Sequence, residues 1–191
     1  MRCISCHRLS WNTFCSRCQI KLLKPSISKR NIGSLQVYSF FKYQNIEDLL
    51  LTKHTPQGFL IYKALAKMTF KPFIKSFINN SRDIVYIIGI DEIINNGYSH
   101  VALLSHQMKY KNVKILHNKL LAQNRVKYAG KSLEFRISNP RDFVYNGLSN
   151  INAILVDDIV TTGITLQEAK VVLKQNGVDV LFAITLADAK A

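Results

Sequence analysis

The hydrophobic and polar positions of the chain follow two alternating patterns, short apolar runs and segments with helical spacing. Apolar runs with the length of strands buried on both faces occupy residues 84–90, 151–156 and 178–186. Between the last two runs, residues 166–175 have the spacing of an amphipathic helix, and Gly177 is placed to end it. A strand, a helix and a second strand at this period predict a parallel sheet with right-handed crossovers, and therefore an α/β fold.

The segments between these runs extend the same pattern. Residues 35–43 are rich in β-branched and aromatic side chains, which predicts one or two short strands. Helical spacing begins at residues 55–56 and continues to Pro72. A further helix is expected over residues 99–109 and a short strand over 112–116.

The length of the chain limits its domain organisation. A chain of 191 residues can bury one sizeable core and carry one small appendage. Residues 24–31 are polar and contain a proline, as expected of a linker. We therefore expect a small N-terminal unit over residues 1–24, a linker over 25–34 and one main domain over 35–191.

Composition argues against disorder and against a membrane span. Hydrophobic residues make up 48% of the chain, and no stretch of eighteen or more uncharged apolar residues occurs. The first seven residues lack the apolar core of a secretory signal. We expect a cytoplasmic protein.

The formal charge of +14 is concentrated in the N-terminal part of the chain. Residues 1–80 hold 13 Lys and Arg against only Glu47 and Asp48, a net charge of +11, whereas residues 81–191 hold 13 against 10, a net charge of +3. Such a field attracts phosphates and suits nucleic acid, an anionic membrane surface or polyanionic small molecules. The alternative is a set of solvated lysines with no partner.

All four cysteines lie within the first 18 residues, as two CxxC hooks: Cys3 with Cys6, and Cys15 with Cys18. Each hook lets two thiolates point at one ion, and two hooks complete a tetrahedral zinc site with no open position. A segment this short builds no apolar core and would fold only with its metal, so we predict structural zinc. His7 is adjacent and could replace one cysteine, although a loop role for it is simpler.

Other chemistries remain open for these cysteines. Residues 3–7 also spell a haem-attachment pattern, but that chemistry needs export. A dithiol redox pair is an alternative that does not explain the second hook. Two disulfides would be unusual in a reducing cytosol.

Cations and aromatic side chains surround the cysteines. Trp11 and Phe14 could stack on the bases of a single-stranded nucleic acid. Alternatively, they could pack the cysteine-rich N-terminal unit, residues 1–24, here called the knuckle, against the main domain. The neighbouring cations are Arg2, Arg8, Arg17, Lys21 and Lys24.

The stretch ILVDDIVTTGIT carries the second candidate site. In open α/β sheets, ligands bind beyond the carboxyl ends of strands, where Asp157 and Asp158 are expected. The following loop, with Gly163 and the start of a helix, suits a phosphate, and Thr165 with Glu168 resembles a capping box. The two carboxylates would repel that phosphate, so they should face ribose hydroxyls or a magnesium ion.

The residues VDDIVTTGIT resemble the phosphoribosyl pyrophosphate (PRPP) motif of type I phosphoribosyltransferases. The resemblance implies a parallel sheet flanked by helices and a magnesium ion held by the acid pair directly or through water. An acid-rich turn with capping threonines and no ligand is the alternative. The implied PRPP-binding residues are Asp157, Asp158, Thr161, Thr162, Gly163 and Thr165.

Together with the two CxxC hooks and the strand segment ending in Lys42 and Tyr43, this motif resembles the ComF family of late competence proteins, which act in DNA uptake by bacteria. The resemblance covers nearly the whole chain and is weakest in its middle. It implies PRPP, magnesium, zinc and single-stranded DNA as ligands. It also implies action at the cytoplasmic side of the membrane, with a helicase or a membrane channel as partner.

Two loops would contact pyrophosphate by this resemblance. Gly97 and Tyr98 agree with the family, whereas its arginines are replaced by Asp91, Glu92 and asparagines. A mobile hood over residues 123–131 would close over the ligand. Its candidate cations, which could equally be solvated, are Arg125, Lys127 and Lys131.

Three functions follow. The first is a PRPP- and magnesium-binding protein that binds single-stranded DNA in natural transformation. The second is a nucleobase phosphoribosyltransferase, for which the sequence offers no evident general base, since His100 and His106 read as surface or core histidines. The third is a nucleic-acid binder regulated by PRPP.

Overall fold

The computed structural model describes residues 1–79, 83–91, 97–124 and 132–191. Within these ranges the helices are α1 (Ser16–Lys21), α2 (Tyr43–Leu50), α3 (Pro56–Met68), α4 (Phe70–Ile78), α5 (His100–His106), α6 (Leu133–Ser138) and α7 (Ile164–Gln175). The strands are β1 (Ser28–Ile32), β2 (Leu35–Lys42), β3 (Val85–Gly89), β4 (Val113–Leu116), β5 (Leu120–Ala122), β6 (Phe143–Tyr145), β7 (Ile151–Val160) and β8 (Val178–Asp188).

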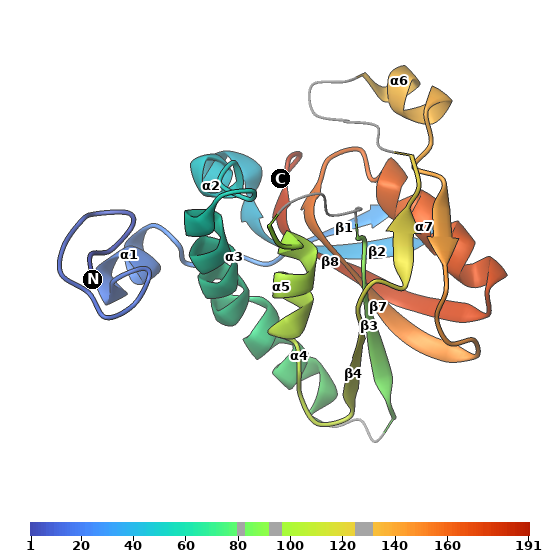
Figure 1. Ribbon diagram of the computed structural model, residues 1–191, viewed down its shortest axis with the longest axis horizontal. Helices are drawn as coiled ribbons and strands as arrows, with labels where there is room; N and C mark the ends of the chain where they lie inside the picture. Colours follow the sequence, from blue (N-terminus) through green and yellow to red (C-terminus); the bar gives the residue numbers. More distant parts are fainter. Residues whose placement is uncertain (80–82, 92–96, 125–131) are drawn as a thin grey trace.

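The main sheet has the strand order β1-β2-β8-β7-β3-β4 (Figure 1). Only β1 is antiparallel to its neighbour, and the pairs β2–β8, β8–β7, β7–β3 and β3–β4 are all parallel. Strands β5 and β6 form a separate antiparallel pair. The predicted α/β class, a mostly parallel sheet flanked by helices, is confirmed.

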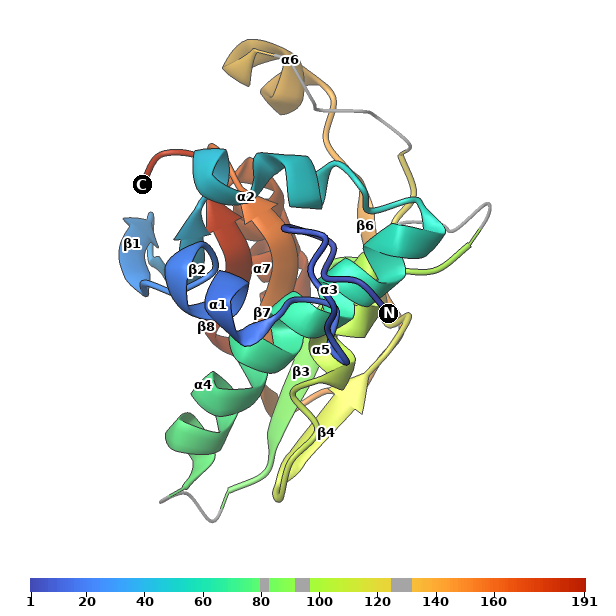
Figure 2. The same cartoon turned by 90° about the vertical axis from the view of Figure 1, so that its left-hand side faces the viewer.

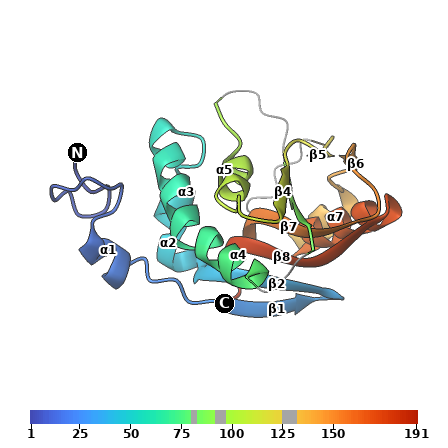
Figure 3. The ribbon, with the colours of Figure 1, turned by 90° about the horizontal axis from the view of Figure 1, so that it is seen from below.

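Helices cover both faces of the sheet. One buried cluster contains Leu65 of α3, Ile74 of α4 and Leu104 of α5, which lie together on one face (Figure 3). The other contains Leu166 and Leu173 of α7 together with residues of β5 and β6. Two separate cores explain why the central strands read as continuous apolar runs rather than as alternating ones.

Strands β7 and β8 carry the centre of both cores. Residues 153–156 are fully buried, as are Ala183 and Ile184 of β8. Each large apolar side chain buried there contributes about 1.5–3 kcal/mol relative to exposure. Strand β7 runs on to Val160, so the acid pair lies inside the strand near its end.

The segment expected as a linker contains an ordered strand. Residues 28–32 form β1, which pairs with β2 through a tight turn at Gly33, where φ is +53°. The Gln167 side chain of α7 donates a hydrogen bond to the Ile32 carbonyl, and Lys170 donates to the Ser34 carbonyl at 3.0 Å. The hairpin is therefore fastened to α7, even though its residues are polar.

The N-terminal segment lies at one end of the molecule, beside α3 (Figures 1 and 2). Phe14 and Leu23 of this segment are buried and belong to the core cluster of α3 and α4. Among the described residues, every helix is too short or too polar to cross a lipid bilayer.

Candidate functional site

The acid pair lies where β7 leads into the loop before α7. Asp158 is buried, with 7% of its surface exposed, whereas Asp157 is half-buried. The Asp158 backbone N–H donates a 2.8 Å hydrogen bond to Asp157 Oδ1. The two neighbouring carboxyl groups consequently have different surroundings.

Three side chains from other elements converge on one oxygen of Asp158. Asp158 Oδ2 lies 3.4 Å from Lys53 Nζ, 3.3 Å from His100 Nε2 and 3.4 Å from the Tyr62 hydroxyl. Lys53 comes from the loop before α3, Tyr62 from α3 and His100 from the first turn of α5. Two potential cations and a hydroxyl donor thus hold this carboxylate in its charged form.

The two carboxyl groups have pKa shifts of opposite sign. Burial acts to raise the pKa of Asp158, but the charges of His100 and Lys53 outweigh it and lower that pKa below its ordinary value. Burial, together with the negative charge of Asp158, raises the pKa of Asp157 well above its ordinary value. Asp158 is therefore a stable carboxylate, whereas ionisation of Asp157 is disfavoured.

Tyr62 is a second buried polar group of the site. Its hydroxyl also lies 3.1 Å from the Leu50 carbonyl, and burial raises its pKa above the ordinary tyrosine value. Tyr62 therefore stays a neutral donor, because losing its proton would place a second negative charge beside Asp158.

The loop between β7 and α7 adopts the conformation that a glycine permits. Gly163 is the N-cap of α7 with φ +85°, and a Cβ built on it would lie 2.3 Å from Ile32 Cδ1. Thr165 lies in the first turn of α7. The Thr162 Oγ1 atom is buried and has no hydrogen-bond partner within the described residues. The backbone of this loop and the first turn of α7 therefore adopt a form suited to an anion.

Two arginines hold Thr161. Arg30 Nη2 of β1 donates to the Thr161 carbonyl at 2.9 Å, and Arg136 Nη1 of α6 donates to Thr161 Oγ1 at 2.5 Å. Arg30 Nε also lies 3.1 Å from Asp188 Oδ2, at the end of β8. The loop is thus fixed from the edge strand on one side and from α6 on the other.

The expected capping box of Thr165 with Glu168 is wrong. Gly163 occupies the N-cap position, so Thr165 is already inside the helix. Glu168 instead accepts hydrogen bonds from the backbone N–H groups of Arg141 and Asp142, at 3.1 and 2.8 Å. The spacing of the two residues was right for a box, but the helix begins two positions earlier than a box would require.

Three residues of the loop after β3, Asp91, Gly97 and Tyr98, have different surroundings. Tyr98 donates to the Thr55 carbonyl at 3.2 Å and its ring packs edge-on against Phe59. A Cβ built on Gly97, where φ is +86°, would have no described atom within 4 Å. Asp91 is buried and accepts bonds from the Ser99 hydroxyl and the Asn118 N–H, both at 3.0 Å. Asp91 therefore ties two loops together.

The candidate cations of the hood and Glu92 lie outside the described residues. The hood residues concerned are Arg125, Lys127 and Lys131.

The four cysteines converge at the N-terminus. Their sulfur atoms all lie within 4.8 Å of one another, and Cys6 Sγ is 3.6 Å from Cys15 Sγ. In a tetrahedral site with Zn–S bonds of about 2.3 Å, sulfur atoms lie roughly 3.8 Å apart. No disulfide joins these four cysteines. The donor set therefore fits a closed zinc site, whereas His7 lies outside the cluster.

The thiols differ in acidity. Burial acts to raise the pKa of Cys3, but backbone hydrogen bonds from Cys15, Cys6 and Ser5 outweigh it and lower that pKa to about 6. Burial raises the pKa of Cys18 to about 12. Four-thiolate coordination of a metal must therefore displace the proton of Cys18, which makes metal binding depend on pH.

The two aromatic residues of the knuckle divide between the two roles considered for them. Phe14 is 1% exposed and packs in the core, whereas Trp11 is 96% exposed. One residue attaches the knuckle and the other is available for a partner.

Five site residues were missed by sequence reasoning: Arg30, Lys53, Tyr62, His100 as a partner of Asp158, and Arg136. Lys53, Tyr62 and His100 precede Asp158 by 58 to 105 residues, and no local pattern marks them. The only signal was that His100 falls on the helix following the first central strand.

Comparison with protein-family models gave no match, and comparison with curated proteins gave none. Among solved structures, the chain is similar to a hypoxanthine phosphoribosyltransferase from Staphylococcus aureus, at 14% identity and a TM-score of 0.42, over 66% of this chain and 62% of that one. The chain thus spans less than two thirds of that protein. It is also similar to an adenine phosphoribosyltransferase from Saccharomyces cerevisiae, at 13% identity and a TM-score of 0.44, over 91% and 88% of the two chains. An adenine phosphoribosyltransferase from Trypanosoma brucei matches at 13% identity and a TM-score of 0.40, over 88% and 78%.

We predict that isosteric amides at the two acids change stability in opposite directions. Asp158→Asn removes the negative charge that Lys53 and His100 contact, and should lower the free energy of unfolding by about 1–3 kcal/mol at pH 7. Asp157→Asn removes a half-buried acid whose folded-state pKa is raised. Ionisation of Asp157 lowers stability as pH rises from the ordinary carboxyl range through that raised pKa, so the amide should stabilise the chain more at pH 8 than at pH 5.

Urea denaturation at the two pH values measures both effects, with Asp179→Asn, at an exposed acid of β8, as the matched control. Equal destabilisation by Asp157→Asn and Asp158→Asn would contradict the assigned roles.

We predict one zinc ion per chain in the protein as purified, measured by elemental mass spectrometry. Cys6→Ser should remove it, because three thiolates leave the tetrahedron incomplete. His7→Ala should keep it, since His7 lies outside the cluster. Zinc retained in Cys6→Ser, or lost in His7→Ala, would show that the ligand set is different.

Proposed function

We propose that the chain binds PRPP, or a related phosphoribosyl ligand, together with magnesium at the end of β7. One observation carries this proposal: an acid pair, with Asp158 buried and Asp157 half-buried, is followed within a few residues by a left-handed glycine and the N-terminus of the twelve-residue helix α7. A sugar phosphate needs hydrogen-bond acceptors for its ribose hydroxyls and donors for its phosphate. The two acids would supply the acceptors, and the backbone of the loop before α7 would supply the donors.

The phosphate would bind to the loop of residues 161–165. Its backbone N–H groups, the positive end of the α7 dipole and threonine hydroxyls supply donors. Thr162 Oγ1 is a buried group without a partner in the described part of the chain, and a phosphate oxygen would satisfy it. Arg30 and Arg136 hold Thr161 and so fix the shape of this loop before a ligand arrives.

The ribose would face the two carboxyl groups. Asp158 is already a carboxylate held by Lys53 and His100, so it is a fixed acceptor for a ribose hydroxyl. Asp157 has a raised pKa and gains most from a cation, which makes it the acid whose ionisation magnesium would favour. Magnesium bound there, directly or through water, would also neutralise pyrophosphate charge.

Transfer of the ribosyl group, where an acceptor is present, would depend on positioning and charge. His100 is the imidazole in contact with the acid pair, and its Nε2 faces Asp158. It is therefore placed to hold that acid rather than to take a proton from an acceptor. We accordingly propose ligand binding as the primary activity and a nucleobase phosphoribosyltransferase as the alternative.

A second function, binding of single-stranded DNA, is favoured by the exposure of Trp11. A fully exposed tryptophan on a basic knuckle offers a stacking face beside cations that attract phosphates. From the resemblance to ComF proteins, we propose that this binding serves DNA uptake at the cytoplasmic side of the membrane, with a helicase or a membrane channel as partner.

Calorimetric titration of PRPP with magnesium should show saturable binding to the wild-type chain. Asp157→Asn should weaken it by about tenfold or more, because the amide neither binds magnesium as a carboxylate does nor accepts through two oxygens. Since the same variant is expected to be at least as stable as wild type, its loss of binding would not reflect unfolding.

Asp179→Asn should bind as wild type does. Titrations of ribose 5-phosphate and of pyrophosphate separate the two ends of the ligand. The absence of binding to wild type, or full binding to Asp157→Asn, would refute the assignment of this site.

Fluorescence anisotropy with a labelled oligo-dT should detect DNA binding that weakens as salt increases. Trp11→Ala should reduce the affinity by about 5- to 150-fold, which corresponds to roughly 1–3 kcal/mol for one stacked base. Leu9→Ala, at a residue 85% exposed on the same knuckle, is the control. An equal loss of affinity in Trp11→Ala and Leu9→Ala would mean that loss of any exposed apolar side chain weakens binding, and would contradict a stacking role for Trp11. Transformation frequency of a strain carrying Trp11→Ala tests the role in uptake.

A further inference from the structure

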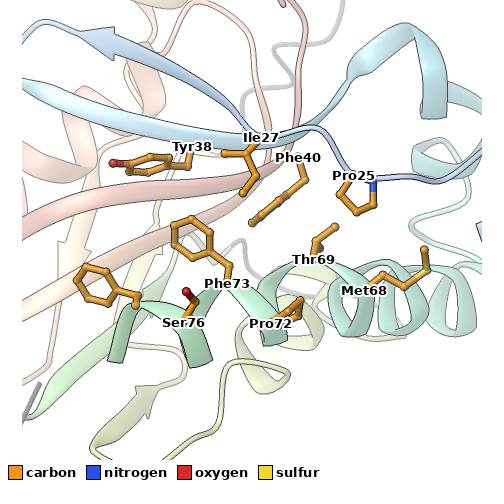
Figure 4. Close-up of a pocket in the computed structure, with 10 residues that line it drawn as sticks. Pro25, Ile27, Tyr38, Phe40, Met68, Thr69, Pro72, Phe73 and Ser76 are labelled. Atoms are coloured by element: carbon orange, nitrogen blue, oxygen red, sulfur yellow. The ribbon is translucent and has the colours of Figure 1, made fainter. Parts of the chain in front are cut away.

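A groove on the far side of the chain from α7 has no role in the PRPP site. It lies between α4 on one side and β2 with the segment directly before β1 on the other, and has a volume of about 500 Å³ (Figure 4). Most of its ten lining residues are apolar, and four of them are aromatic. The main lining residues are Pro25, Ile27, Tyr38, Phe40, Phe73 and Phe77.

The walls of the groove are held by ring contacts. The Tyr38 ring lies 5.4 Å from that of Phe73, and Phe182 of β8 lies 5.3 Å from Tyr38 and 4.9 Å from Phe77. Rings locked in this way keep their positions without a ligand. Yet Ile27 and Phe77 remain 57% and 41% exposed. The groove is therefore preformed and open.

The groove exists because α4 does not reach the sheet edge. Its aromatic residues pack on β2 and β8, which leaves the same face of β1 uncovered. Lys29 of β1 is opposite Tyr38 in the register, and its Nζ lies 5.8 Å from the centre of that ring. A basic side chain thus borders the apolar floor.

Strand β1 also offers a free edge. Within the described residues it pairs with β2 alone. In an antiparallel ladder, every second residue turns its N–H and C=O groups away from the partner strand. An extended peptide can add to such an edge, and its alternate side chains then enter pockets on one face of the sheet. Edge and groove lie side by side on this chain.

The charge around the groove selects an acidic occupant. Residues 24–42 and 67–78, which include the hairpin, α4 and the residues just before α4, contain seven Lys and Arg and no Asp or Glu. Arg30 faces the other side of the sheet, which leaves six. A second copy of the chain, with a formal charge of +14, would be repelled. An acidic segment would be attracted at long range.

We propose that β1 and this groove bind an extended acidic segment of a partner protein, with large apolar side chains at alternate positions. The backbone of the segment pairs with β1, and its apolar side chains lie against Tyr38, Phe73 and Phe77. A peptide fits better than a nucleic acid, because only a peptide matches the regular backbone groups of an edge strand. The acidic residues between the apolar ones remain in the field of the surrounding lysines.

The test uses the full chain and a fluorescein-labelled nine-residue peptide in which Phe alternates with Asp. Anisotropy should show saturable binding, and hydrogen exchange in residues 27–32 should slow when the peptide is bound. Phe77→Asp should weaken binding by about tenfold or more. Phe59→Asp, at a phenylalanine of similar exposure (37%) on α3, should leave it unchanged. Ile27→Asp, at a more exposed position, repeats the test without changing α4.

Three results would overturn the inference. The first is equal binding of a peptide with the same composition in which the Phe and Asp residues form separate blocks, since charge alone would then explain it. The second is binding insensitive to both Phe77→Asp and Ile27→Asp. The third is loss of oligo-dT binding, or of binding to vesicles containing phosphatidylserine, in these two variants while the peptide still binds, which would assign the groove to nucleic acid or to lipid.

Discussion

The charge on Asp158 is the constraint on which the site depends. A carboxylate buried to this degree is stable only with partners, and Lys53, Tyr62 and His100 supply them from the loop before α3, from α3 itself and from α5. The same contacts therefore join the helical layer to the end of β7. A change at Asp158 would leave a lysine and a histidine facing each other without the charge between them, so this acid supports the structure as well as any ligand.

Asp157 differs from Asp158 in that its surroundings disfavour its charged form. Within the described residues its side chain accepts one hydrogen bond, from the Asp158 N–H, and burial beside the negative charge of Asp158 disfavours its ionised form. An amide would accept the same backbone bond without that repulsion. A residue that is electrostatically unfavourable without a ligand points to a functional site, and the divalent cation or ribose hydroxyl proposed above would relieve the strain on its charge.

How much the sequence predicts depends on how local each signal is. The central strands are readable because residues 153–156 are apolar on both faces, and the two CxxC hooks are readable because their ligands are adjacent in the chain. The residues of strand β1 read as a linker because they are polar and follow a proline, whereas their order comes from pairing with β2 and from contacts to α7. The partners of Asp158 lie 58 or more residues away, and the start of α7 is set by the conformation of Gly163, so neither could be read from spacing.

Strand β1 lies between the proposed ligand site and the proposed peptide groove. Side chains alternate along β1, so Arg30 and Ile32 turn toward the loop before α7, where they contact Thr161 and Gly163, while Lys29 turns toward the groove. A partner that adds to β1 would restrict the same strand that positions this loop. If ordering β1 favours the ligand-binding form of the loop, the ligand must favour partner binding by the same free energy, because coupling between two sites is reciprocal. A short strand of polar residues can in this way connect sites on opposite faces of the sheet.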